Sequence, residues 1–216
     1  MTAIEGDWPA LTLPSMEAEF LRETYDKARV ILEYGSGGST VLGGSAAGKL
    51  IFSVETDRQW ALSLQRRFDE ADLPSPVIIY HVDIGETGAW GRAKDDSSWR
   101  KFYRYPTSIW TENFFRHPEV VLIDGRFRAA CLVNACLRAK QPMTVLFDDY
   151  ADRKAYHAVE ALLKPSDIIG RMAVFHIEPQ EWPEWTTDLL LELCTHATFS
   201  SDKVDYDHVP DLPILK

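Results

Sequence analysis

The chain has 216 residues, about the size of one large domain, so we expect a single domain over residues 1–216. Hydrophobic residues make up 45% and charged residues 26% of the sequence, values typical of a folded globular protein, which exclude a disordered, collagen-like or coiled-coil chain. The 33 acidic residues outnumber the 23 basic ones, and the resulting net charge of −10 disfavours bulk binding to nucleic acid because it repels phosphate.

Short apolar runs alternate with segments of helical period, a pattern typical of an α/β fold whose mostly parallel sheet carries helices on both faces. The expected helices are residues 15–28 with Ser15 as cap, 39–46, 57–71, a helix that includes 132–139, and 155–163. The expected strands are residues 29–33, 50–54, 77–81, 120–123, 144–147 and 171–177. Residues 187–197 fit either a capped helix or a seventh strand, and both interpretations stay open.

The cysteines and the N-terminal residues predict the cellular compartment. Cys131, Cys136 and Cys194 form no CxxC pair, and an odd number of cysteines argues against a disulfide framework. The first residues are acidic and lack the basic and apolar regions of a signal peptide. No apolar run approaches the roughly 18 to 20 residues that span a bilayer. We therefore expect a cytoplasmic protein that does not enter a membrane.

A glycine cluster, residues 35–38, joins the first expected strand to the next helix. Glycines at such a turn let the backbone bend sharply and approach a ligand without a clash from Cβ. Glu55, at the end of the second strand, can accept hydrogen bonds from both hydroxyls of a ribose. Asp83 and Ile84, after the third strand, offer a carboxylate to an amino group and an apolar side chain to a purine face. Together these residues predict a nucleoside site.

The order of these motifs resembles the class I S-adenosylmethionine-dependent methyltransferases, over about residues 28–177. The resemblance implies a three-layer Rossmann-like methyltransferase fold and S-adenosylmethionine as cofactor. In that family, the acid before the turn holds the methionine amino end and the glycines lie under the methionine part. The acid that ends the second strand binds the ribose, and the residues after the third strand bind the adenine. The cofactor-binding residues implied here are Glu33, Gly35, Ser36, Gly37, Glu55, Asp83, Ile84 and, after the fourth strand, Asp124.

Three carboxylates follow the fourth and fifth expected strands. Asp124 ends the fourth strand, and Asp148 and Asp149 end the fifth, so all three are expected at one edge of the sheet. Methyl transfer from an activated sulfonium requires the enzyme to align donor and acceptor and to take a proton from an oxygen or nitrogen nucleophile. Asp124 and Asp148 are the catalytic candidates for that base.

The same acids resemble the metal ligands of the magnesium-dependent catechol and caffeoyl-type O-methyltransferases. Those enzymes use one acid after strand four and an Asp-Asn pair after strand five, where this chain has Asp148 and Asp149. They also carry a basic residue shortly after the first acid. Phe127 lies at its place here, between Arg126 and Arg128. We therefore predict no metal site and keep a magnesium site as the alternative.

The long connection over residues 83–118 interleaves aromatic and basic side chains. It carries Trp90, Trp99, Phe102, Tyr103, Tyr105 and Trp110 among Arg92, Lys94, Arg100, Lys101 and Arg104. Three interpretations stay open. The segment could be a lid over an aromatic or anionic substrate, it could pack its aromatic rings on the sheet edge, or it could form a homodimer surface.

The sequence thus predicts a methyltransferase that uses S-adenosylmethionine on an unidentified acceptor, with a small molecule favoured over a macromolecule. One alternative is an NAD-dependent oxidoreductase, because a dinucleotide GxGxxG turn looks similar, although Thr40 lies at the place of its last glycine. The other is a methyltransferase-like binding protein without turnover.

Overall fold

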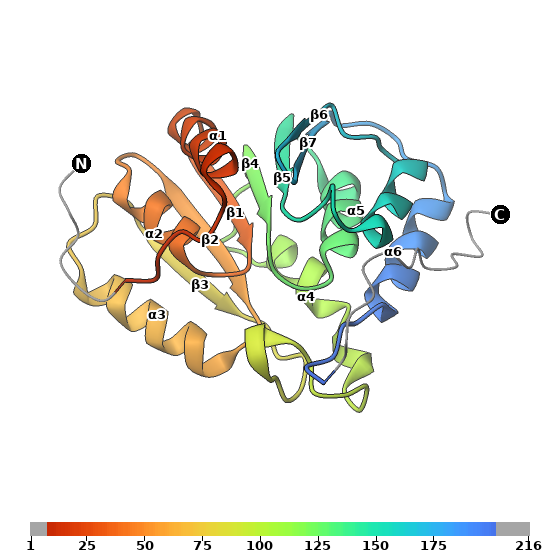
Figure 1. The fold of residues 1–216 in the computed structure, drawn as a ribbon, viewed down its shortest axis with the longest axis horizontal. Coiled ribbons are helices and arrows are strands. Elements are labelled where there is room, and N and C mark those ends of the chain that lie inside the picture. Colours follow the sequence, from red (N-terminus) through yellow and green to blue (C-terminus); the bar gives the residue numbers. More distant parts are fainter. Residues whose placement is uncertain (1–7, 202–216) are drawn as a thin grey trace.

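A computed structural model of the protein describes residues 8–201. One seven-stranded sheet runs through it, in the order β3-β2-β1-β4-β5-β7-β6. Strands β1 to β5 pair in parallel, whereas β7 is antiparallel to both β5 and β6. The strands are β1 (Val30–Tyr34), β2 (Leu50–Glu55), β3 (Val77–His81), β4 (Val120–Ile123), β5 (Met143–Phe147), β6 (Asp167–Ile169) and β7 (Met172–Ile177). The expected mostly parallel sheet is confirmed (Figure 1).

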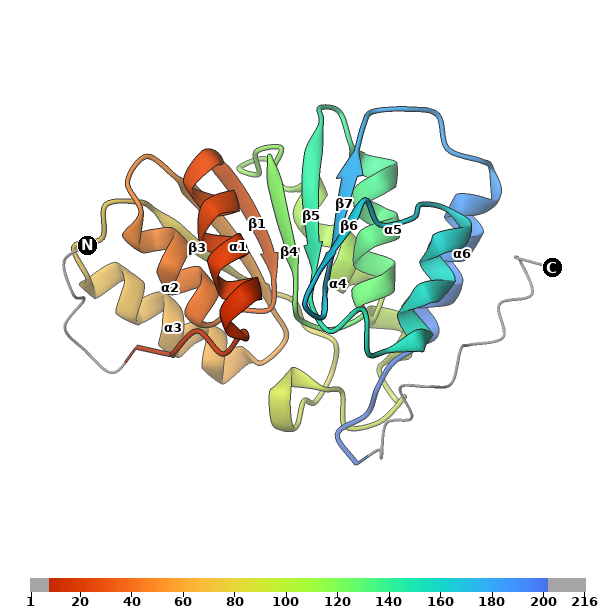
Figure 2. The ribbon, with the colours of Figure 1, turned by 45° about the horizontal axis from the view of Figure 1, so that its top comes forward.

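Helices cover both faces of the sheet, as Figure 2 shows. One face carries α1 (Ser15–Lys27), α2 (Gly38–Ser45) and α3 (Arg58–Glu70). The other face carries α4 (Arg104–Thr107), α5 (Arg128–Arg138), α6 (Trp185–Thr195) and the 3-10 helix η4 (Lys154–Ala161). The three-layer arrangement expected from the sequence is therefore confirmed. Within residues 8–201, no helix is both long and apolar enough to cross a membrane.

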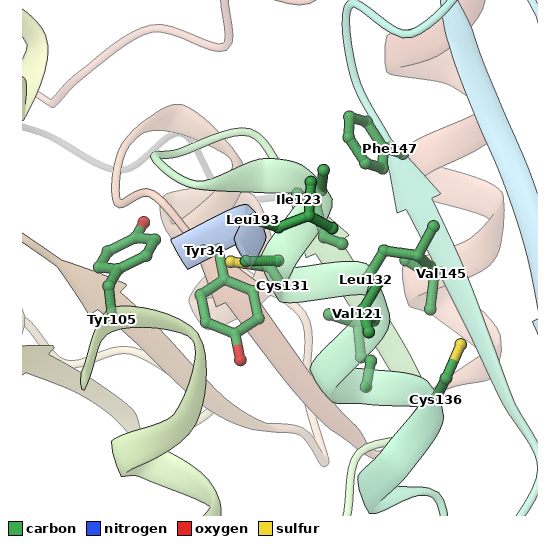
Figure 3. Packing of buried hydrophobic residues seen from close by; sticks show 14 of the residues in the cluster. Tyr34, Tyr105, Val121, Ile123, Cys131, Leu132, Cys136, Val145, Phe147 and Leu193 are labelled. Atoms are coloured by element: carbon green, nitrogen blue, oxygen red, sulfur yellow. The ribbon is translucent and has the colours of Figure 1, made fainter. Parts of the chain in front are cut away.

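The core forms because strand side chains alternate between the two helical layers. In β1, Ile31 packs in the cluster under α1, whereas Leu32 and Tyr34 pack in the larger cluster under α5. Figure 3 shows Leu132 of α5 against the strands that carry Val121 and Val145. The inner strands are buried on both faces, which is why they read as continuous apolar runs.

The C-terminal third departs from the expected elements in two places. Residues 155–163 were expected as an α-helix, and η4 is a 3-10 helix instead. In a 3-10 helix, residues three apart lie on one face, and here Tyr156, Val159 and Leu162 all pack on the core. Strand β6 was missed because its residues are exposed or half-buried and form no apolar run. Residues 187–197, left open above, belong largely to helix α6.

The N-terminal helix agrees with the expected range, but its cap does not. Helix α1 begins at Ser15 itself, with Pro14 at the cap position and no side-chain hydrogen bond to the first turn. Proline fits there because its fixed φ suits a helix start and its missing N–H would have no helical partner.

The long connection after β3 contains four short helices, η1 (Ala89–Gly91), η2 (Trp99–Lys101), α4 and η3 (Ser108–Thr111). In Figure 2 its yellow-green part lies beyond the lower end of the sheet. Phe102, Tyr105 and Ile109 are almost fully buried in the core, whereas Trp90 and Trp99 are 83% and 54% exposed. The packing interpretation is therefore right for the second half of the segment. The lid and homodimer interpretations stay predictions for its exposed rings.

Candidate functional site

A cavity of about 510 Å³ opens where β1, β2 and β4 end at the carboxyl edge of the sheet. Its size falls in the usual range for small-molecule sites. Four stretches of chain line most of it: residues 9–13, the turn 35–39 after β1, residues 55–57 after β2, and residues 124–126 after β4. Trp60, Trp90, Gly91 and Tyr105 complete the lining.

The turn after β1 brings the backbone close to the neighbouring strand end. Gly35 has φ +101°, a left-handed conformation that favours glycine, and a Cβ there would lie 3.0 Å from the backbone of Gly125. Gly37 is the cap residue before helix α2, and its N–H donates to Thr40 Oγ1 at 2.9 Å. Gly35, Ser36 and Gly37 all line the cavity, so the turn lies where the resemblance requires it.

Glu33 lies behind this turn and does not line the cavity. Its side chain is fully buried, and its carboxylate accepts hydrogen bonds from the hydroxyls of Tyr25, at 2.7 Å, and Thr40. Burial raises the pKa of Glu33 to about 7, against the lowering effect of these hydrogen bonds. The expected direct contact with the methionine amino end does not fit this placement. Instead, the hydrogen bonds of Glu33 connect Tyr25 of α1 and Thr40 of α2 to the end of β1.

Glu55 lines the cavity at the end of β2 and organises the two loops around it. Its Oε1 accepts the backbone N–H groups of Thr56, at 2.7 Å, and Asp57, at 2.8 Å. Its Oε2 accepts, among residues 8–201, only the N–H of Ser36, at 3.2 Å. Because a carboxylate has about four acceptor positions, Oε2 keeps capacity for hydroxyl donors. Burial raises the pKa of Glu55, and the backbone hydrogen bonds act in the opposite direction.

Asp83 and Ile84 lie outside the cavity lining, in contrast to the expectation for adenine. The side chain of Asp83 is 54% exposed and pairs with Lys101 at 2.7 Å, which is the main reason why its pKa is lowered. Ile84 is 1% exposed and packs in the core. Gly91 lies against the end of β2 instead, and its carbonyl accepts the hydroxyl of Thr56 at 2.8 Å. The loop around Gly91 thus lies beside Glu55 at the cavity, where the residues after β3 were expected.

Asp124 lines the cavity and pairs with a buried arginine. Its side chain is 35% exposed, and Arg128 Nη2 lies 2.8 Å from its Oδ1. Burial raises the pKa of Asp124 to about 6, with Arg128 lowering it and the neighbouring Asp148 and Asp149 raising it. The guanidinium of Arg128, 5% exposed, also donates to the main-chain oxygens of Asp124, Gly125 and Asp148 at 3.0, 3.1 and 2.7 Å.

Asp148, the second catalytic candidate, is placed wrongly for a base. Its side chain is 1% exposed, it does not line the cavity, and Arg171 donates to both of its carboxylate oxygens, at 3.0 and 2.9 Å. Asp149 is paired with Arg128, Arg153 and Arg171 at 3.1, 2.5 and 3.1 Å. Asp148 and Asp149 therefore belong to an ion-pair network, and neither lines the cavity.

This network also bears on the magnesium alternative. Oxygen atoms of Asp124, Asp148 and Asp149 lie within 4.8 Å of one another, close enough to share a cation. However, Arg128 and Arg171 already supply positive charge to these carboxylates at hydrogen-bonding distance. A divalent ion would have to displace them, so the donor set does not fit a resident metal.

The cavity lining also includes residues outside the set predicted for cofactor binding and catalysis. Arg126, Tyr105 and Trp90 line the cavity, as does the segment 9–13, whose Ala10 packs directly on Gly38. A Cβ on Gly38 would lie 2.3 Å from the Ala10 oxygen, so only glycine allows this approach. The sequence signal for Arg126 was its place two residues after the acid that ends β4.

Comparison with solved structures decides the family. The chain superposes on the crystal structure of a methyltransferase-like protein from Silicibacter pomeroyi DSS-3 with a TM-score of 0.83 and 44% sequence identity, over 87% of this chain and 98% of that one. The chain belongs to the class I S-adenosylmethionine-dependent methyltransferase superfamily, as a methyltransferase-like protein. The family resemblance noted in the sequence is confirmed.

Other matches share far less sequence. An O-methyltransferase from Bacillus cereus, in complex with S-adenosylhomocysteine, is 17% identical over 67% of this chain and 60% of that one, with a TM-score of 0.48. The tRNA (m1A58) methyltransferase TrmI from Aquifex aeolicus is 13% identical over 82% and 74%, with a TM-score of 0.49. Similarity at this level carries no argument about the acceptor. No protein-family model and no curated protein matches the sequence.

The raised pKa of Glu33 predicts that the free energy of unfolding falls as pH rises. An ordinary glutamate in the unfolded chain titrates near 4.5, whereas Glu33 titrates near 7 in the fold. Between these values the folded state binds more protons, so the free energy of unfolding falls as pH rises, by about 3 kcal/mol in total above pH 7. In Glu33→Gln this contribution disappears. Urea unfolding from pH 5 to pH 8 should give a flatter profile than the wild type. If the free energy of unfolding of Glu33→Gln depended on pH as steeply as that of the wild type, the raised pKa of Glu33 would be contradicted.

The arginine pairs predict that magnesium does not stabilise the protein. Millimolar MgCl₂ should leave the melting temperature of the wild type unchanged, because a ligand raises it only by binding the folded state. Arg171→Gln is the matched variant, since it removes the guanidinium that donates to both carboxylate oxygens of Asp148, and there MgCl₂ should raise the melting temperature. A magnesium-dependent increase in the wild type would show that the ion displaces the arginines.

Proposed function

We propose that this protein transfers a methyl group from S-adenosylmethionine to an oxygen or nitrogen of a small-molecule acceptor. The observation that carries the proposal is the shared cavity, which brings the glycine turn, Glu55 and Asp124 together at one edge of the sheet. Membership of the methyltransferase superfamily supports the choice of cofactor. Crevices at the carboxyl ends of parallel strands are the usual ligand sites of such sheets.

The cofactor would lie along the lining in the order of the strands. Its methionine part would lie over Gly35, Ser36 and Gly37, and its ribose hydroxyls would donate to Oε2 of Glu55. Trp90 would supply the apolar face for the adenine that Ile84 was expected to supply, because this residue lines the cavity and is 83% exposed.

The chemistry that the cofactor supplies is an activated methyl group on a sulfonium. This chain aligns the acceptor and removes its proton. Asp124 is the candidate base, since it lines the cavity and its pKa of about 6 leaves it ionised at neutral pH yet more basic than an ordinary aspartate. The acceptor's electron pair would form the new bond to the methyl carbon, the bonding pair to that carbon would leave with sulfur as S-adenosylhomocysteine, and Asp124 would take the acceptor's proton.

Neither alternative from the sequence gains support. A dinucleotide turn needs a third glycine for close packing of helix on strand, and here Thr40 at that place is fully buried and hydrogen-bonded to Glu33.

The three cysteines are all buried and unpaired, which suits the reducing cytoplasm proposed for this protein.

The two acids after β2 and β3 give a matched pair of variants for the cofactor site. Glu55→Gln should weaken binding of S-adenosylhomocysteine about ten- to hundredfold, because it removes a charged acceptor from the ribose hydroxyls. Asp83→Asn should leave the affinity within about twofold, because its carboxylate pairs with Lys101 outside the cavity. Isothermal titration calorimetry measures both, with thermal melts to verify folding. Equal effects of the two substitutions would contradict this cofactor placement.

The raised pKa of Asp124 predicts the pH dependence of turnover. Activity should be present above about pH 6 and lost as pH falls below it, because the base must be ionised. Release of S-adenosylhomocysteine from S-adenosylmethionine, measured over a panel of phenols, amines and hydroxy acids, finds an acceptor and then gives this profile. Asp124→Asn should lower kcat about 10²- to 10⁴-fold. If the variant instead loses affinity for S-adenosylhomocysteine with kcat unchanged, Asp124 binds the cofactor and is not the base.

A further inference from the structure

Arg126 differs from the arginines of the neighbouring ion-pair network. It lines the cavity beside Asp124 and is half-buried. Among residues 8–201, its guanidinium has no carboxylate within ion-pair distance and makes no hydrogen bond. Asp124, two residues earlier, pairs with Arg128 instead. The backbone of Arg126 is held in place, since its N–H donates to the Tyr105 hydroxyl at 3.3 Å.

The surroundings of Arg126 make an uncompensated positive charge costly. Burial lowers the pKa of Arg126, and the neighbouring Arg128 lowers it further, whereas the tyrosines 105 and 156 act in the opposite direction. An arginine nevertheless stays charged at neutral pH. A desolvated cation without a counter-charge raises the free energy of the empty site, and a bound anion would remove that cost.

We propose that Arg126 is the anion-binding residue of this cavity and pairs with a carboxylate or phosphate group of a bound ligand. The planar guanidinium offers parallel N–H donors that match two oxygens of either group. The local charge favours this role. Within the network, Arg128, Arg153 and Arg171 balance the three aspartates, so the charge of Arg126 is left over on a protein whose net charge is −10.

Two ligands could bring such an anion to Arg126, and the inference rests on the proposed function for the first. S-adenosylmethionine carries a carboxylate on its methionine part, which would lie near Arg126 because Gly35 and Gly125 touch. A methyl acceptor with its own carboxylate or phosphate is the second source. In that case Asp124 and Arg126 would hold the two ends of one molecule, and the acceptor class would be hydroxy or amino acids and their phosphates.

The test compares ligands with and without the carboxylate. S-adenosylhomocysteine and 5′-methylthioadenosine share the adenine, ribose and thioether, but only the first carries the amino acid part. Both are titrated calorimetrically into the wild type, Arg126→Gln, Arg126→Lys and the control Arg104→Gln. Arg104 is exposed and does not line the cavity, so its substitution makes the same change of net charge elsewhere. Benzoate and inorganic phosphate are titrated as separate probes, in the absence and presence of S-adenosylhomocysteine.

The outcomes separate the sources. A loss of about tenfold or more for S-adenosylhomocysteine in Arg126→Gln, with 5′-methylthioadenosine unchanged, supports the proposal and assigns the anion to the cofactor. Unchanged nucleoside binding with lost binding of benzoate or phosphate supports it and assigns the anion to the acceptor. Partial recovery in Arg126→Lys is expected in either case. If all four ligands bind Arg126→Gln as they bind Arg104→Gln, the proposal is overturned. If the wild type fails to bind S-adenosylhomocysteine, the proposed function fails, while the benzoate and phosphate titrations still decide the role of Arg126.

Discussion

The buried guanidinium of Arg128 is the constraint on which the carboxyl edge of the sheet depends. It donates to main-chain oxygens that follow β4 and β5 and pairs with Asp124. Arg128 therefore links the carboxyl ends of β4 and β5, which no tight turn connects. A buried arginine without these acceptors would be strongly unfavourable. The position of Gly125 follows from this, and with it the close approach of the glycine turn after β1. The cavity exists between parts that this side chain holds together.

The strands and most helices were predictable because their signals are local. Parallel strands buried on both faces are continuous apolar runs, and β4, which is fully buried, has the expected bounds. Two elements of the C-terminal third, β6 and η4, lack such a signal. Strand β6 is short and largely exposed. The apolar residues of η4 fit the period of an α-helix, 3.6 residues, about as well as that of a 3-10 helix, 3 residues. The packing of Tyr156 and Val159 on the core selects the 3-10 helix. Tertiary contacts decide these elements, and the sequence pattern does not contain them.

The candidate site was predictable in part, and the misses share one physical cause. An acid at a strand end is recognisable in sequence, but its role depends on which partner reaches it from far along the chain. Asp83 forms an ion pair with Lys101, and Asp148 forms one with Arg171. Glu33 accepts a hydrogen bond from Tyr25. Glu55 and Asp124 remain at the cavity. The sequence order of motifs therefore locates the edge of the sheet at which the cavity lies, whereas side-chain pairing decides which of these acids line it.

The distribution of charge at this edge is compatible with both proposed roles, Asp124 as a base and Arg126 as an anion-binding residue in the same cavity. Pairing with Arg128 keeps Asp124 ionised at neutral pH, while burial and its two acidic neighbours keep its pKa near 6. If Arg126 also paired with Asp124, in addition to Arg128, the pKa of Asp124 would fall and its carboxylate would be a weaker base. The separation matters for both roles. Because Asp124 is satisfied by Arg128, Arg126 keeps its donors for a ligand, and because Arg126 does not pair with Asp124, that carboxylate stays basic enough to accept a proton.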